Sequence, residues 1–329
     1  MPYQYSILRL NFKTAVRFGN GKGAAGLDAG KISLPSDSLF SAVFTEYIRF
    51  FGEEEADKLV ASFEKAETAI SSLFPWKRTD KGFSYYIPRP IFPGVKRNSE
   101  DNVKKQLKKI KYISLSNLKK NIDFINGKTD LGEESEWDLN IGSEMVTDRV
   151  NLTGEKPEPY RVTSYRFVEG SGLYFVIRYT DKALFENFIK AVELLGISGI
   201  GGKVSSGLGK YTLDIDNMEG QGEEKLLYDM MEDKNAKVQM LIGAYHPKEE
   251  EIEKLKQEGY TYILEKRDGF CTSPYFSNAN GPLKRKSCIM VAEGSCFAER
   301  LEGQILDLSY GNFHKVYRLG KTLFVGVAV

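Results

Sequence analysis

The sequence predicts an α+β protein with two ferredoxin-like domains in tandem, the first carrying a large insertion and the second reduced. Three observations lead to this class. The early part of the chain shows the order strand, helix, insertion, hairpin, helix, strand; alternating apolar segments recur near the end; and a polar stretch rich in Gly and Glu separates the two parts. We place the first domain at 1–215 with an insertion at 74–159, a linker at 216–236 and the second domain at 237–329.

The first domain is expected to open with a strand and two helices. Residues 3–12 alternate apolar side chains between two faces, as a strand does. Ser36 stands where an N-cap belongs and Asp37 follows in the first turn, after which aromatic residues recur at helical spacing. We expect a helix that starts with Ser36 as its cap and stops at Gly52, and a second helix over 53–73.

The insertion at 74–159 has an irregular pattern. It is predicted to contain a strand at 83–91, a lysine-rich helix at 103–120 and an acidic loop that leads to the segment TDRVNLTG. The lysine run fits a solvated helix face as well as it fits a nucleic-acid contact.

Regular elements return after the insertion. Strands are predicted at 160–168 and 173–179, and the glycines between them indicate a hairpin. Asp181 is placed to cap a helix that stops at Gly196, and residues 210–215 form the last strand. RNA-recognition modules share this βαββαβ order with many unrelated domains, so the fold class alone does not decide function.

The second domain is predicted to be mostly β. Its charged segment 248–258 has the composition of a helix, and a second helix is missing or reduced. Strands are expected at 238–246, 260–267, 285–294 and 321–329.

Composition excludes several classes of protein. Apolar residues make up 41% and charged residues 28% of the chain, which favours a globular fold over disorder. No apolar stretch reaches the roughly 18 residues that span a bilayer, so we expect a cytoplasmic protein without a membrane partner. Three cysteines and two histidines at no zinc-like spacing predict no metal site and no cofactor. Because the net charge is only +1, a nucleic-acid site must come from local clustering of basic residues.

The run GIGGKVSSGLGKY at 199–211 is the strongest candidate site. A Walker loop would need Lys and Ser/Thr directly after its second glycine, but Leu208 and Gly209 follow Gly207. A dinucleotide fingerprint would need a glycine where Val204 stands. Both of those loops open a helix, whereas this one follows a helix and leads into a strand. Two interpretations remain: a loop whose N–H groups, hydroxyls and lysines receive a polyanion backbone, or a turn that merely permits tight packing.

This run resembles the glycine-rich loop of the RAMP superfamily, the repeat-associated CRISPR proteins built from ferredoxin-like, RRM-like domains. Further segments resemble, in the expected order, one branch of it: the fourth subunit of the type III-A CRISPR Csm effector complex. These segments are LPSDSLFSAV (34–43), TDRVNLTG (147–154), KRDGF followed by Ser273 (266–273), RKS (285–287) and EGSCF (293–297). The resemblance implies an antiviral RNA-binding subunit that grips the repeat-derived 5′ handle of the CRISPR RNA. It also implies docking against the large palm-domain signalling subunit and the neighbouring backbone RAMP subunit.

The resemblance further implies which residues contact RNA. Most belong to the glycine-rich loop, one to the insertion, one to an earlier glycine-rich stretch at 14–34 and two to the second domain. The insertion would also supply a thumb-like hairpin that wedges between nucleotides. The expected RNA-binding residues are Gly201, Gly202, Lys203, Ser205, Ser206, Gly207, Gly209, Lys210, Arg149, Lys22, Arg267 and Phe270.

Two alternatives to this function stay open. One is a metal-independent CRISPR RNA-processing endoribonuclease, because ribonucleases of the same superfamily use general acids and bases, often histidine. His246 and His314 stand beside no recognisable Ser/Lys/Tyr constellation, so we interpret both as structural and expect no catalytic residue. The other alternative is a protein-only assembly adaptor, in which the glycine-rich loop packs against a partner.

Overall fold

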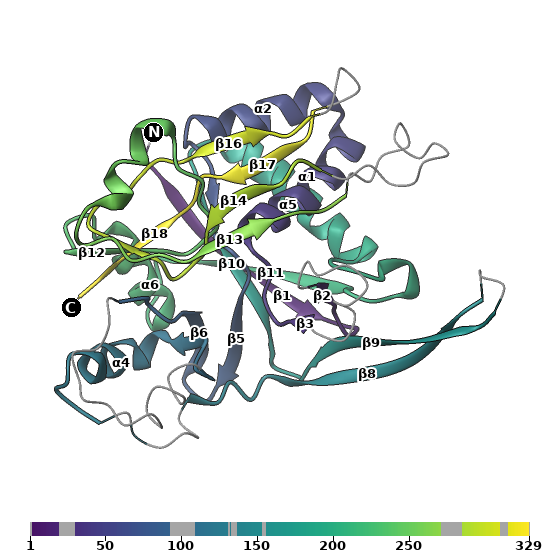
Figure 1. Cartoon of the computed structure of the whole chain (residues 1–329), viewed down its shortest axis with the longest axis horizontal. Coiled ribbons are helices and arrows are strands. Elements are labelled where there is room, and N and C mark those ends of the chain that lie inside the picture. The colour runs from purple at the N-terminus through teal and green to yellow at the C-terminus, as the bar shows by residue number, and fades with distance from the viewer. Residues whose placement is uncertain are drawn as a thin grey trace.

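The computed structural model describes residues 2–19, 30–92, 109–130, 132, 137–152, 156–270, 285–309 and 315–328. The fold is a mixed α+β arrangement of antiparallel sheets and helices (Figure 1). Within these ranges, no helix combines the length and the apolar character needed to cross a membrane. Predictions made for Lys22, Ser273 and His314 lie outside the described residues.

A central antiparallel sheet organises the first two thirds of the chain. Its strands lie in the order β11-β1-β10-β5-β6-β7, and the short strand β4 pairs with β10. Leu8 of β1 faces Phe175 of β10 on one side and Ile215 of β11 on the other, so β1 lies inside the sheet. The bounds are β1 (Gln4–Phe12), β4 (Ala69–Ile70), β5 (Phe74–Thr79), β6 (Gly82–Pro88), β7 (Tyr112–Ser114), β10 (Ser171–Tyr179) and β11 (Tyr211–Asn217).

Three helices, α1 (Ser36–Phe51), α2 (Glu53–Glu64) and α5 (Lys182–Ser198), cover one face of the central sheet. Phe40 of α1 and Phe188 of α5 pack in one core cluster with Leu8, Leu10 and Phe175 of the sheet. The helix predicted from the aromatic spacing of 36–51 is therefore confirmed, because its apolar stripe meets the sheet.

The start of α5 is confirmed and its predicted stop is wrong. The Asp181 carboxylate accepts hydrogen bonds from the N–H groups of Ala183 (2.8 Å) and Leu184 (3.1 Å), which is N-capping. The helix continues past Gly196 to Ser198. Gly196 serves packing instead, because a Cβ there would lie 2.6 Å from the carbonyl oxygen of Tyr211.

The other face of the sheet is covered by the rest of the chain. Helix α4 (Leu118–Ile125), helix α6 (Glu223–Glu232) and a sheet of order β15-β12-β18 pack on it. Their buried side chains, such as Leu118, Leu227 and Val325, share one core cluster with Trp76 and Tyr174 of the central sheet. The two parts of the chain are thus held together by a common core. The bounds of the second sheet are β12 (Val238–Leu241), β15 (Cys296–Phe297) and β18 (Phe324–Val327).

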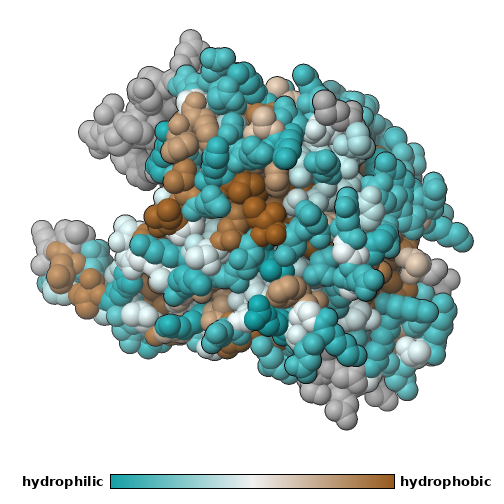
Figure 2. All heavy atoms as spheres, turned by 180° about the vertical axis from the view of Figure 1, so that it is seen from behind, coloured by the Kyte–Doolittle hydropathy of each residue, from teal (hydrophilic) through white to brown (hydrophobic). Residues whose placement is uncertain are grey.

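Four two-stranded antiparallel ribbons complete the described fold. The ribbon β8–β9 projects from the body of the molecule (Figure 1). Figure 2, the view from behind, shows apolar atoms on this projection, where Val150 is 55% and Leu152 is 75% exposed. The ribbons are β2 (Phe18–Gly19) with β3 (Gly30–Lys31), β8 (Gly142–Asn151) with β9 (Glu158–Phe167), β13 (Leu264–Arg267) with β14 (Cys288–Val291), and β16 (Gln304–Asp307) with β17 (Tyr317–Gly320).

The hairpin predicted between 160–168 and 173–179 is wrong in its pairing. Both strands exist, but β9 pairs along its whole length with β8, whereas β10 pairs with β1 and β5. Strand β10 is buried on both faces, so it belongs in the middle of the central sheet rather than in a surface hairpin. Strand β5, which opens the predicted insertion at 74–159, is likewise part of that sheet.

Two predicted helices do not reach their predicted ends, and one helix lies where a linker was predicted. Helix α2 ends at Glu64 instead of residue 73, because Ala66 adopts a left-handed backbone (φ 57°) and the Lys321 ammonium binds the Glu64 carbonyl (2.6 Å). In the described part of the lysine-rich segment, residue 109 is helical and is followed by β7, a 3₁₀ turn and α4, so no single helix runs on to residue 120. The predicted linker at 216–236, in turn, contains the unforeseen helix α6.

The charged segment 248–258 forms two 3₁₀ turns, η5 (Glu249–Glu251) and η6 (Lys254–Lys256), instead of a helix. The reason is that Glu251 is buried. Its carboxylate accepts hydrogen bonds from the Tyr245 hydroxyl (2.8 Å) and from the N–H groups of Lys248 (2.9 Å) and Glu302 (2.6 Å). A regular helix would point this carboxylate elsewhere and leave those donors without their acceptor.

The start of α1 joins the two parts of the chain, which corrects the prediction that Ser36 is a helix cap. Pro35 holds the N-cap position, and the buried Ser36 hydroxyl accepts a hydrogen bond from the N–H of Ala244 (2.9 Å). Asp37, only 1% exposed, forms an ion pair with Arg318 of β17. The motif 34–43 therefore connects α1 to the second part of the fold.

Candidate nucleic-acid interface

The glycine-rich loop connects α5 to β11 and has an unusual backbone. Gly199, Gly201, Gly207 and Gly209 all have positive φ values, between 78° and 97°. Lys203 also lies in the left-handed region (φ 63°), just before the 3₁₀ turn η4 (Val204–Ser206). Non-glycine residues adopt this region at a cost, so the sequence of alternating glycines matches the path of the loop.

Three of these glycines are required by the packing of the loop itself. A Cβ at Gly209 would lie 2.0 Å from the carbonyl oxygen of Ile200, and a Cβ at Gly199 would lie 2.6 Å from that of Leu208. A Cβ at Gly201 would lie 2.5 Å from the carbonyl oxygen of Arg17. Gly207, in contrast, faces open space. Tight packing therefore explains part of the glycine content, and Gly207 is left on the outer surface of the loop.

The segment before β2, residues 14–17, packs against the inner side of the loop. The N–H of Gly209 donates to the carbonyl of Ala15 (2.8 Å), and the N–H of Gly202 donates to the carbonyl of Arg17 (2.8 Å). The N–H of Lys210 donates to the Thr14 hydroxyl (3.0 Å). These bonds fix the inner side of the loop, while Ser205, Ser206 and Lys210 are exposed on its outer side and Lys203 is half-buried.

The ribbon β8–β9 meets the outer side of the loop. The guanidinium of Arg149 on β8 donates to the hydroxyl of Ser206 across 3.0 Å. The ammonium of Lys203 lies 5.2 Å from the centre of the Tyr160 ring on β9, within the range of a cation–π contact. Arg149 and Tyr160 face each other in the ribbon register, so the two contacts are adjacent. The structure thus brings Arg149 to the loop with which the sequence grouped it.

Two residues of this interface were missed by sequence reasoning. Tyr160 starts the strand predicted at 160–168, but its position opposite Arg149 depends on a ribbon register that the sequence did not reveal. Arg17 forms a parallel bridge with Gly201, and its guanidinium lies 3.0 Å from where a Cβ of Gly202 would be. The sequence feature that could have identified Arg17 is a single arginine in the glycine-rich stretch at 14–34.

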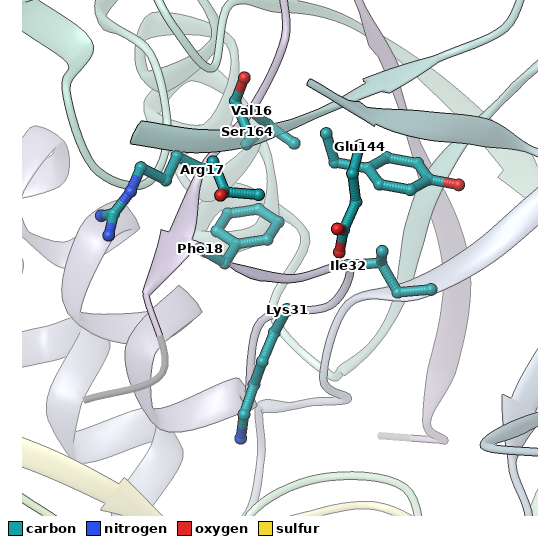
Figure 3. Close-up of a pocket in the computed structure, with 9 residues that line it drawn as sticks. Val16, Arg17, Phe18, Lys31, Ile32, Glu144 and Ser164 are labelled. Carbon is teal, nitrogen blue, oxygen red and sulfur yellow. The ribbon is translucent and has the colours of Figure 1, made fainter. Parts of the chain in front are cut away.

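A small cavity lies under the interface, where β2, β3, β8 and β9 meet (Figure 3). Val16, Phe18 and Ile32 form apolar walls, and the Glu144 carboxylate points toward them. Its volume is about 10 Å³, which is room for about one water molecule and too little for a nucleobase. The cavity is therefore a small packing gap between the ribbons β2–β3 and β8–β9.

The residues expected from the second domain lie elsewhere. Arg267 is 13% exposed in its side chain, with its Nη2 at 3.0 Å from the Glu265 carboxylate and its Nε at 3.9 Å from that of Asp37. These ion pairs give it a structural role. Phe270 is 56% exposed.

His246 lies in a surface cavity together with Lys266, Ser287 and Cys288. Burial lowers the pKa of its imidazole, so the ring is neutral at pH 7. Its Nδ1 lies 3.0 Å from the Pro247 carbonyl and 3.4 Å from the amide nitrogen of Gln304. The sequence did not reveal that a lysine and a serine share this cavity. In the described part of the chain, no group of three or more His, Cys, Asp or Glu side chains is placed to hold a metal ion.

A family model described as the CRISPR Csm4 C-terminal domain matches residues 234–327. A curated relative from Mycobacterium tuberculosis (strain CDC 1551 / Oshkosh), named CRISPR system Cms protein Csm4, is 30% identical over 307 residues, which are 93% of each chain. A relative of the same name from Streptococcus thermophilus is 28% identical over 337 residues, 99% of each chain.

Solved structures agree on the fold. The chain is similar to one in a crystal structure of a Csm3–Csm4 subcomplex of the type III-A CRISPR-Cas interference complex, with a TM-score of 0.65, 18% identity and coverage of 99% of this chain and 100% of that one. It is also similar to one in a Csm1–Csm4 cassette in complex with cA4, with a TM-score of 0.61, 20% identity and coverage of 100% and 99%. Because a relative that is 30% identical is matched over nearly its full length, the chain belongs to the Csm4 family of CRISPR proteins, the RAMP branch that its motifs resemble.

Proposed function

We propose that the chain is a non-catalytic RNA-binding subunit of a type III-A CRISPR interference complex, and that it grips the 5′ repeat-derived handle of the CRISPR RNA. The observation that carries the proposal is the meeting of Arg149 with Ser206 across 3.0 Å. A guanidinium and a hydroxyl at this distance can donate hydrogen bonds to two oxygens of the same phosphate group. Lys203 and Lys210 add two positive charges on the same loop.

The closed faces of the central sheet support binding at the loop. In many RNA-recognition modules, bases stack on the open face of the sheet. Here Trp76, Tyr85 and Tyr174, which point to the face opposite α1 and α5, are buried under the second sheet, α4 and α6. Stacking on this face would require those elements to move away. The edge formed by the glycine-rich loop and the ribbon β8–β9 stays accessible.

We also propose that the first domain is ferredoxin-like and that the second is a reduced copy. The strand order β11-β1-β10-β5, with α1 after β1 and α5 after β10, is the order of a ferredoxin-like sheet. For the second domain, the support consists of a sheet of three strands in the order β15-β12-β18.

The ribbon β8–β9 fits the role of the thumb that wedges between nucleotides. It projects from the body, and its outer part exposes Val146, Val150 and Leu152 by 61%, 55% and 75% (Figures 1 and 2). Apolar side chains at such a position can insert between bases, because every base has a face on which they stack. The same ribbon carries Arg149, so wedge and phosphate contact would act together.

The partners that we propose follow from the relatives. Chains of similar fold occur in crystal structures of a Csm3–Csm4 subcomplex and of a Csm1–Csm4 cassette. We infer that this chain contacts the corresponding backbone subunit and the corresponding large subunit of its own complex.

Binding of single-stranded repeat RNA to the purified full chain tests the proposal. We expect Lys203→Ala with Lys210→Ala to weaken binding and to reduce the slope of log K against log salt by about 1.4, since each phosphate contact contributes about 0.7. Lys182→Ala with Lys190→Ala removes the same charge from the exposed surface of α5 and is the matched control. If the loop variant kept both affinity and slope, the loop would serve protein assembly, as in an adaptor.

One observation favours the endoribonuclease alternative: the cavity in which a neutral His246 lies with Lys266 and Ser287. A neutral imidazole could take the proton of a 2′-hydroxyl, and a lysine could stabilise the charged phosphorane. We propose that the chain does not cleave RNA, since this cavity is formed by β13 and β14, whereas the proposed RNA contacts belong to the glycine-rich loop and the ribbon β8–β9. Incubation of the chain with repeat RNA, with and without divalent metal, tests this. Site-specific cleavage that His246→Ala abolishes would overturn the non-catalytic assignment.

A further inference from the structure

The position of the glycine-rich loop depends on the segment that leads into β2. Gly202 and Gly209 donate hydrogen bonds to the carbonyls of Arg17 and Ala15, and a Cβ at Gly201 would strike the Arg17 carbonyl. A displacement of this segment would therefore move the inner side of the loop. The segment continues into β2, which pairs with β3 through Phe18 opposite Lys31.

An ion pair between side chains connects β3 to the ribbon β13–β14. The Lys31 ammonium lies 3.6 Å from one carboxylate oxygen of Glu265. The other oxygen of Glu265 lies 3.0 Å from Nη2 of Arg267. Glu265 thus holds a lysine of the first domain and an arginine of the second domain at once.

Arg267 of this ribbon is paired in turn with Asp37 of α1, a buried residue. The Arg267 Nε lies 3.9 Å from the carboxylate of Asp37, which also forms the buried ion pair with Arg318. Asp37 is 1% and Arg318 is 5% exposed, so both side chains are fixed by packing. A continuous series of ion pairs therefore runs from this buried anchor to the ribbon that backs the glycine-rich loop.

We infer that Glu265 is a positioning residue for the glycine-rich loop, acting through Lys31 and the ribbon β2–β3. Through it, the second domain sets where the loop lies. The inference rests on the proposed function, because it gives the loop its importance as an RNA contact. It also gives a reason why the motif KRDGF at 266–270 follows a glutamate and lies beside the motif at 34–43.

Electrostatics and positioning predict opposite signs for one substitution. Glu265→Gln removes a negative charge from the protein, so charge alone would make binding of a polyanion tighter. If Glu265 positions the loop, the same substitution loosens the segment behind it and makes RNA binding weaker, with the salt slope unchanged because no phosphate contact is lost. The sign of the effect distinguishes the two roles.

The experiment measures hydrogen exchange in the full chain without RNA, in peptides that cover 199–210, and RNA affinity separately. We expect Glu265→Gln and Lys31→Gln each to speed exchange of the loop amides by about two- to fivefold, the range of a partly exposed ion pair. The double variant should add little to either single variant, because both cut the same connection. Asp268→Asn is the matched control: its carboxylate is 33% exposed and lies 3.6 Å from Lys266, against 34% and 3.6 Å for Glu265 and Lys31.

The outcomes distinguish a positioning role of Glu265 from a purely repulsive charge. Faster loop exchange in Glu265→Gln with unchanged exchange in Asp268→Asn supports the positioning role. Unchanged loop exchange in Glu265→Gln overturns it, and so does tighter RNA binding, which would make Glu265 a simple repulsive charge. If the wild-type chain bound no RNA, the proposed function would fail, whereas the exchange comparison would still decide whether Glu265 positions the loop.

Discussion

The packing of the glycine-rich loop predicts a large difference between two glycine-to-alanine substitutions. Gly209 and Gly207 have nearly the same backbone, with φ values of 78° and 83°. An alanine at either position adopts a left-handed conformation, which costs about 1–2 kcal/mol. At Gly207 this is the whole cost, because the new methyl group faces open space.

At Gly209 the methyl group meets the backbone of Ile200, with the ideal Cβ 2.0 Å from its oxygen and 2.8 Å from its nitrogen. That backbone must move by more than 1 Å to reach an ordinary contact of about 3.4 Å, which strains the loop by roughly 1–3 kcal/mol. The movement also disturbs the hydrogen bond from Ile200 N–H to the Gly209 carbonyl (2.9 Å), worth about 1 kcal/mol. We therefore expect Gly209→Ala to destabilise the chain by about 3 kcal/mol or more.

Urea unfolding followed by circular dichroism measures both variants, with the midpoint compared at equal m-value. Equal losses for Gly209→Ala and Gly207→Ala would refute the reasoning, because they would mean that the loop does not hold the path that makes Gly209 necessary. RNA affinity adds a second comparison. Since the Gly207 methyl projects outward, Gly207→Ala should affect RNA binding more than its small stability loss explains.

Three further outcomes follow from the same contacts. Asp37→Asn should lower the free energy of unfolding by about 3 kcal/mol, because it leaves the buried Arg318 without its counter-ion. Asp57→Asn removes an exposed ion pair, so it should cost less than about 1 kcal/mol. Urea titration measures both variants. The pKa of His246 is lowered by burial, so below pH 6.5 the unfolded chain binds a proton that the folded chain does not. Stability should fall as pH drops through this window, by less than about 1.4 kcal/mol per pH unit, and His246→Gln should reduce that dependence. Leu152→Ser should change stability by less than about 0.5 kcal/mol and still weaken RNA binding, as an RNA-binding titration beside thermal unfolding would reveal.

The sequence predicted elements that local signals define. The helix at 36–51 and the start of α5 at Asp181 depend on neighbouring residues alone, namely an apolar stripe and a capping carboxylate. The pairing of β10 and the conformation of residues 248–258, in contrast, depend on contacts between residues that are far apart in the sequence. Glu251 reads as a solvated helix residue in a charged run, and only the folded chain brings the Tyr245 hydroxyl and the N–H of Glu302 to its carboxylate.

The candidate site shows the same division. Glycine spacing and basic residues identified the loop, but the sequence could not separate glycines that allow packing from one that faces solvent. Gly209 and Gly207 differ in this respect only because Ile200 lies beside one of them. The contact between Arg149 and Ser206 joins residues 57 positions apart. The family resemblance, rather than spacing, grouped these two residues in advance.

The shared core gives a physical reason why the proposed RNA site lies at an edge loop. Burying Trp76 and Tyr174 under the second sheet stabilises the joined domains, and it removes the face on which a single RNA-recognition module would stack bases. What remains accessible is the border of the sheet, where the chain leaves α5 and enters β11. A loop there has little core of its own, so it needs support from elsewhere: glycines that let it pack on the Arg17 segment, and the series of ion pairs that reaches that segment from Asp37. On this reasoning, second-domain substitutions along that series should alter RNA binding without contacting RNA, whereas equally exposed charges outside it should not.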